Sequence, residues 1–182
     1  MNKLFKNLNP HTRIKTSILT KIALSVAILI ILSQITIPLG TIAITFSLLA
    51  VLIIPAFVDA PFASIACIIY IALGAFGLPV FAGAKGGLSV LLGPTGGYII
   101  SYPFMCMCLC HFISIYRTQK KPIFIIIGLI LSFIICYTFG AIGLKLYLGC
   151  SIAKSLAVGV LPFIIPDTIK AIIAYFIIKR VR

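Results

Sequence analysis

The chain has 182 residues, of which 62% are hydrophobic and only 9% are charged. Soluble domains carry about 25% charged residues, so this composition excludes a water-soluble globular protein. Fifteen Lys and Arg residues stand against two acids, but no basic stripe interleaved with aromatic residues is present, which argues against nucleic-acid binding. Long apolar runs instead recur along the chain and predict one multi-pass domain embedded in a lipid bilayer.

The apolar runs predict an all-α fold with six transmembrane helices. Residues 1–21 form a basic tail, and residues 22–182 form the membrane domain. A basic segment before an apolar run resembles a signal peptide, but no small-residue cleavage site follows, so we expect the first run to be retained as a helix. Proline, glycine and charged residues separate the runs. The expected helices cover about residues 22–37, 42–58, 63–76, 98–116, 122–141 and 161–178, with a loop at about 144–160.

The first predicted helix carries two small residues four positions apart, Ala23 and Ala27. Residues at this spacing share one face of a helix, and small side chains there allow another helix to approach closely. The spacing alone fits packing within the chain as well as docking of a partner helix. Gln34, near the end of this helix, carries no specific signal.

A glycine-rich segment separates the third and fourth predicted helices, at about residues 77–97. Non-helical backbone near a membrane is tolerated only where protein buries it or a cavity hydrates it. Glycine also lets backbone N–H and C=O groups approach a ligand closely. A P-loop is excluded because the GxxxxGK[ST] pattern is absent. The segment is therefore either a ligand-binding loop or a plain connection that reverses the chain.

The fourth predicted helix contains Cys106, Cys108 and Cys110 beside His111, a combination that resembles a metal site. In a helix, Cys108 points away from the face that Cys106 and Cys110 share. Free cysteine packs as a small apolar side chain. We therefore expect these cysteines to be packing residues, with no metal and no cofactor.

The last predicted helix carries Asp167 and Lys170 in "PFIIPDTIKAIIAYFIIKR". Residues three apart lie on one helix face, and ionised residues within a span are usually paired and face a cavity. Pro166 suits the start of a helix, where a carboxylate caps free N–H groups. Asp167 could therefore be a helix cap paired with Lys170, a ligand-binding acceptor, or both at once.

The distribution of positive charge predicts the orientation in the membrane. The tail, the 59–61 turn, the 117–121 loop and the C-terminus together hold eleven Lys and Arg residues, whereas the connections on the opposite side hold only Lys85, Lys145 and Lys154. Because Lys and Arg that flank spans stay in the cytoplasm, both termini are predicted to be cytoplasmic. The glycine-rich segment is then extracellular.

Candidate catalytic groups are scarce in this sequence. It contains no glutamate, and its two aspartates, Asp59 and Asp167, are predicted on opposite sides of the membrane. No metal-ligand spacing, nucleophile–base set or nucleotide-binding motif is present. We therefore expect a protein that is not an enzyme, and any ATP hydrolysis coupled to transport must come from partner subunits.

Two motifs resemble a known family. The segment "PVFAGAKGGLSVLLGPTGGY" (Pro79–Tyr98) closely resembles the signature of the BioY family, the biotin-specific substrate-binding (S) components of energy-coupling factor (ECF) transporters, and "LLGPTGGY" is its most specific part. The P-x-x-x-x-D-x-x-K spacing of Pro162–Lys170 is similar to the pattern in the family's last helix. Ala23 and Ala27 resemble the AxxxA motif by which S components dock on the transmembrane coupling (T) subunit.

The resemblance implies a six-helix S-component fold in the cell membrane, with a biotin site at its outer face. Its expected partners are the T subunit and the ATPase subunits of the transporter. The implied biotin-binding residues come from the glycine-rich segment and the last helix: Gly83, Lys85, Gly86, Gly87, Gly93, Thr95, Gly96, Tyr98, Asp167 and Lys170. An S component for another vitamin is the alternative.

The chemistry of biotin suggests which part of the ligand each of these residues binds. Asp167 would accept the ureido N–H groups, and Lys170 would bind the ureido carbonyl or orient Asp167. Lys85 or backbone N–H groups of the glycine-rich segment would hold the carboxylate. Tyr98 and apolar side chains would enclose the rings. A site built on buried polar groups rejects analogues that leave those groups unpaired.

Overall fold

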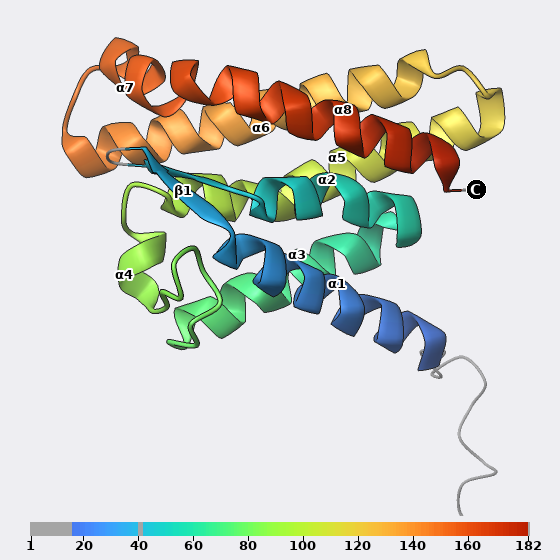
Figure 1. The fold of residues 1–182 in the computed structure, drawn as a ribbon, viewed down its shortest axis with the longest axis horizontal. Coiled ribbons are helices and arrows are strands. Elements are labelled where there is room, and N and C mark those ends of the chain that lie inside the picture. The colour runs from blue at the N-terminus through green and yellow to red at the C-terminus, as the bar shows by residue number, and fades with distance from the viewer. Residues whose placement is uncertain (1–15, 40–41, 182) are drawn as a thin grey trace, which may run out of the picture.

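The structure is a computed structural model that describes residues 16–39 and 42–181. Most of the predicted basic tail and Arg182 lie outside the described residues. The described chain is mostly helical, and its long helices pack side by side (Figure 1).

Four helical segments are long and apolar enough to cross a membrane. Two shorter apolar helices, α2 and α3, lie at the positions of the second and third predicted spans but have only 11 and 16 residues, whereas a span needs about 20. The described part of the chain is therefore typical of a multi-pass membrane protein. The helices are α1 (Thr16–Gln34), α2 (Ser47–Phe57), α3 (Ala60–Ala75), α4 (Leu88–Leu91), α5 (Gly96–Gln119), α6 (Ile123–Leu148), α7 (Ile152–Gly159) and α8 (Ile164–Arg180), with a 3-10 turn η1 (Leu161–Phe163) joining α7 to α8.

A short β-hairpin interrupts the otherwise all-helical chain between α1 and α2. Strands β1 (Thr36–Leu39) and β2 (Ile42–Thr45) pair antiparallel, with Thr36 opposite Thr45. The sequence had predicted the end of one helix and the start of the next over these residues. The prediction placed these residues in the ends of two helices, whereas their β-branched Thr and Ile side chains favour extended backbone.

A second difference lies in the predicted loop at residues 144–160. Helix α6 continues to Leu148, and Gly149 ends it with a left-handed φ of 61°. Glycine adopts this conformation without the penalty that a Cβ atom brings, so it is the common residue after a helix. Ser151 then starts α7, where its hydroxyl accepts a hydrogen bond from the Lys154 backbone N–H at 3.3 Å.

The helices run between two distinct ends of the molecule (Figure 1). The start of α1, the α2–α3 turn, the α5–α6 connection and the C-terminal end of α8 lie together at one of them. We call this the basic end, because it carries Arg117, Lys120, Lys121, Lys179 and Arg180. The hairpin, α4 and the α6–α7 connection lie at the other, which we call the pocket end.

Helix α5 is the centre of the packing and contacts α2, α3 and α6. It approaches α6 closely at Gly97, where an added Cβ atom would overlap the Phe139 carbonyl oxygen and lie 3.2 Å from the Gly143 Cα. Glycine at both positions therefore lets the two backbones touch. Further along α5, Met105 and Leu109 are fully buried in the main core cluster.

Candidate ligand-binding site

A cavity of about 460 Å³ opens at the pocket end. Residues of the hairpin, the glycine-rich segment, α2, α3, α5, α6 and α8 line it. Small-molecule sites are usually concave spaces of about 300–1,000 Å³ with a few convergent polar groups in a mainly apolar wall. The cavity matches this description in volume, and two clusters of hydrogen-bonded polar groups lie in its wall.

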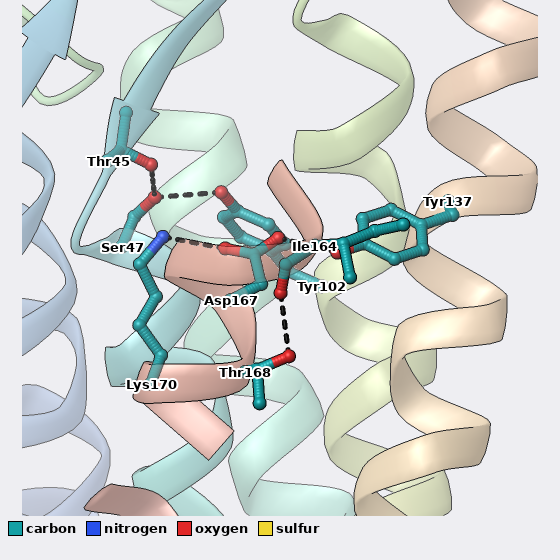
Figure 2. Close-up of polar contacts among 8 residues, drawn as sticks. All are labelled: Thr45, Ser47, Tyr102, Tyr137, Ile164, Asp167, Thr168 and Lys170. Atoms are coloured by element: carbon teal, nitrogen blue, oxygen red, sulfur yellow. Dashed lines mark hydrogen bonds and ion pairs between the residues drawn. The ribbon is translucent and has the colours of Figure 1, made fainter. Parts of the chain in front are cut away.

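The first cluster is an ion pair on α8. The Lys170 Nζ donates to the Asp167 Oδ1 at 2.8 Å, and the Tyr137 hydroxyl of α6 donates to the Asp167 Oδ2 at 2.8 Å (Figure 2). Asp167 and Lys170 are each only 4% exposed. The predicted pairing of these two residues on one face of the helix is confirmed.

The start of α8 differs from the predicted cap. Helix α8 begins at Ile164, so Asp167 lies in its first turn, and the N-cap residue Phe163 makes no side-chain cap hydrogen bond. Pro166 is tolerated in this turn because the N–H groups there have no partner within the helix. The carboxylate still lies near the positive end of the helix dipole. Its hydrogen bonds, however, go to side chains and not to the backbone.

The ion pair has unused hydrogen-bonding capacity. Each carboxylate oxygen has two acceptor sites, and one hydrogen bond to each oxygen leaves the second site free. The Lys170 ammonium has three N–H donors, of which Asp167 takes one. Because both charged groups line the cavity, they can bind a ligand that presents N–H donors beside an acceptor oxygen.

The second cluster is a chain of three hydroxyl groups, which the sequence analysis missed. The Ser47 Oγ lies 2.7 Å from the Thr45 Oγ1 and 2.8 Å from the Tyr102 hydroxyl (Figure 2). Three hydroxyls have three donor hydrogens and share two hydrogen bonds, so one hydrogen stays available to an acceptor in the cavity. The Tyr102 ring also stacks on Tyr70, with the ring centroids 6.4 Å apart.

The glycine-rich segment supplies only part of the lining predicted for it. Gly83, Lys85, Gly93 and Thr95 line the cavity. The other three predicted glycines, Gly86, Gly87 and Gly96, do not appear in the lining, and each has a structural reason to be glycine. An added Cβ atom at Gly86 would overlap the Leu78 carbonyl oxygen, and one at Gly96 would overlap the Leu91 carbonyl oxygen. Gly87 has a left-handed φ of 97°.

Tyr98 lines the cavity from the start of α5 and is held from two sides. Its hydroxyl donates to the Gly159 carbonyl oxygen at 2.7 Å, at the end of α7. Its ring lies against Gly140 of α6, where an added Cβ atom would overlap the ring. The hydroxyl hydrogen is thus used in a hydrogen bond within the protein, and the ring of Tyr98 is available to contact a ligand.

The remaining candidate residues lie away from the cavity. Ala23 and Ala27 are exposed on α1, and no residue of that helix lines the cavity. Cys106 and Cys110 are buried in the core, whereas Cys108 is half-buried. Within residues 16–39 and 42–181, no three His, Cys, Asp or Glu side chains gather as metal ligands would.

Comparison with known proteins gives a consistent set of relatives. Residues 3–182 match the profile of the BioY family. The "Probable biotin transporter BioY" of Pyrococcus horikoshii is 34% identical over 162 residues, which cover 88% of this chain and 93% of that protein. The "Biotin transporter BioY" of Thermotoga maritima is 32% identical over 166 residues, which cover 90% of this chain and 95% of that protein.

A solved structure has the same fold. It is the crystal structure of the S-component for biotin from an ECF-type ABC transporter, and it superposes with a TM-score of 0.84. The match covers 95% of this chain and 93% of that chain, at 29% sequence identity.

Proposed function

Since the chain belongs to the BioY family, we propose that it captures biotin and serves as the substrate-specific component of an uptake system for this vitamin. Its relatives are named as transporters and not as enzymes. Its place is a cell membrane, which it spans with six helices, including α2 and α3. Partner subunits supply ATP hydrolysis.

The buried Asp167–Lys170 pair is the observation that carries this proposal. A buried ion pair is costly to desolvate, so its retention calls for a purpose beyond stability. Biotin has a ureido ring with two N–H donors and one carbonyl oxygen. Asp167 accepts hydrogen bonds from the N–H groups, and Lys170 donates one to the carbonyl oxygen. These bonds use the acceptor sites of Asp167 and the donors of Lys170 that are free in the structure. Tyr137 fixes the carboxylate in the orientation that this requires.

The rest of the cavity suits the other parts of biotin. The rings of Tyr70, Tyr98 and Tyr102 face the apolar thioether ring, and Lys85 holds the carboxylate at the tail. Nanomolar binding corresponds to about −12 kcal/mol. Spread over roughly 16 ligand atoms, that energy stays below the ceiling of about −1.5 kcal/mol per atom.

Titration of the purified chain with a panel of vitamins tests the proposed function. Isothermal titration in detergent should give one biotin per chain and no comparable heat with thiamine, riboflavin or folate. Stronger binding of another vitamin would favour the alternative, an S component for that vitamin. Binding of none of them would remove the proposal.

The pocket end faces the outside of the cell in this proposal, with both termini in the cytoplasm. The concentration of Lys and Arg at the basic end supports this orientation, because such residues stay in the cytoplasm. Lys154 and Lys121 are exposed at opposite ends and can each be replaced by Cys in a Cys150→Ser background. An impermeant maleimide should label Lys154→Cys in intact cells and Lys121→Cys only after lysis. The reverse pattern would contradict the orientation.

Docking on the T subunit is assigned to Ala23 and Ala27. Both are exposed on α1, and small side chains there let a partner helix approach closely. Replacing both with Leu should reduce copurification with the T and ATPase subunits without weakening biotin binding, because no α1 residue lines the cavity. Unchanged copurification would place the docking surface elsewhere.

A further inference from the structure

Helix α1 contacts the glycine-rich segment beside the cavity through the residues at its C-terminal end. No α1 residue lines the cavity, but residues at its C-terminal end bind the backbone of the segment that does. Ser33, which is 1% exposed, donates to the Val80 carbonyl oxygen. Gln34, the last residue of α1, makes the more extensive contact.

Gln34 binds the segment through both ends of its side-chain amide. Its Nε2 lies 3.2 Å from the Val80 carbonyl oxygen and 3.4 Å from the Phe81 carbonyl oxygen. Its two N–H donors are shared between these oxygens and two acceptors within α1. Its Oε1 accepts from the Ala84 backbone N–H at 2.9 Å. One side chain thus holds both sides of a short turn that lies 46 to 50 residues further along the chain.

The turn needs this support at Ala84. Gly83 and Ala84 both have left-handed backbone, with φ of 70° and 55°. Glycine adopts such values readily, whereas a residue with a Cβ atom pays a penalty. The hydrogen bond from the Ala84 N–H to Gln34 offsets that penalty in the folded chain. Without it, the turn would relax more easily to other conformations.

The turn is also closed by its own backbone, since the Phe81 N–H donates to the Lys85 carbonyl oxygen at 2.9 Å. Further contacts hold its two flanks. Phe81 is 1% exposed and packs on Gly74, where an added Cβ atom would overlap the ring. The Gly87 backbone N–H donates to the Gly74 carbonyl oxygen at 2.7 Å. Between these anchors, the Gln34–Ala84 contact is the one side-chain hydrogen bond to residues 82–86 in the described part of the chain. Three of those residues, Ala82, Gly83 and Lys85, line the cavity.

We propose that Gln34 is a positioning residue that latches residues 80–84 over the cavity and thereby sets how fast the bound ligand leaves. The inference rests on the proposed function for the identity of that ligand, biotin. Gln34 itself does not line the cavity, so its effect on the ligand acts through the turn. Loss of the latch raises the dissociation rate, while association depends mainly on the remaining walls.

Kinetic measurements on three variants test the latch. Gln34→Met keeps the length and apolar stem of the side chain but removes every hydrogen bond, and should raise the biotin dissociation rate about tenfold. The association rate should stay within about twofold. Gln34→Glu keeps the acceptor for the Ala84 N–H and should fall between Gln34→Met and the wild type. Thr20→Val, which changes another exposed polar residue of α1, should behave as the wild type.

Hydrogen–deuterium exchange gives a second readout that needs no ligand. The Ala84 amide should be protected in the wild type and in Gln34→Glu, and should exchange at least tenfold faster in Gln34→Met. Unchanged exchange in Gln34→Met, or an unchanged dissociation rate in a variant that binds biotin, would overturn the latch. Failure of the wild type to bind biotin would instead remove the proposed function, and the exchange experiment would still decide whether the latch exists.

Discussion

Replacing Asp167 with Asn should weaken biotin binding by at least tenfold. The Asn side chain keeps an acceptor for Tyr137 but loses the negative charge that Lys170 and the ureido N–H groups share. Hydrogen bonds to a charged group contribute about 1.5–3 kcal/mol each, or roughly ten- to a hundredfold in affinity. Isothermal titration with biotin measures the loss. Thr168→Val is the matched control, because Thr168 is exposed on the same turn and its hydroxyl donates to the Ile164 carbonyl oxygen of its own helix (Figure 2).

The stability of the same variants separates a binding role from a folding role. Asp167→Asn leaves a buried lysine without its counter-charge, which costs about 3–5 kcal/mol. The double variant Asp167→Asn/Lys170→Met removes both charges and should recover most of that loss. It should not recover biotin binding, since neither charged partner for the ureido ring remains. Binding by the double variant at wild-type strength would show that the pair is structural only.

Replacing Gly97 with Ala should destabilise the chain and reduce biotin binding together. The added methyl group would overlap the Phe139 carbonyl oxygen and force α5 away from α6. Overpacking of this kind costs about 1–3 kcal/mol, which lowers the Tm of a chain of this size by roughly 2–12 °C. The cavity would open as well, because Tyr98 on α5 and Tyr137 on α6 form walls on either side of this contact.

Circular dichroism in detergent measures the Tm of the Gly97→Ala variant, and titration measures its affinity for biotin. Ile100→Ala is the control, because this residue of α5 is 43% exposed and its truncation leaves the helix contact intact. The control should bind biotin as the wild type does. If Gly97→Ala unfolded at the wild-type temperature, α5 and α6 would not approach as closely as the structure indicates.

Features that depend on local pattern were predictable from the sequence. Long apolar runs identified the positions of the helices, since hydropathy acts residue by residue. The spacing of Asp167 and Lys170 identified their pairing, because positions three apart in a helix always share a face. The hairpin was missed because an apolar, β-branched stretch of eight or so residues has no signal that separates a strand from a short helix.

Features that depend on distant contacts were not predictable. Ser47 and Tyr102 are 55 residues apart in the sequence, and only the packing of α2 on α5 brings their hydroxyls together. Gln34 reaches Ala84 across 50 residues, and nothing near Gln34 in the sequence indicates its partner. Tyr137 likewise reads as one more aromatic residue of an apolar helix until α8 places Asp167 beside its hydroxyl.

The contact between Asp167 and the ureido ring can be measured by changing both partners. Methylation of a ureido nitrogen removes one N–H donor from biotin. Asp167→Asn removes the carboxylate that is proposed to accept that hydrogen bond. Isothermal titration of wild type and variant with biotin and N-methylbiotin gives the coupling between the two changes. If the groups meet, methylation should weaken wild-type binding at least tenfold but change binding to the variant by less than about threefold. Equal losses in both proteins would mean that the ureido ring lies elsewhere in the cavity.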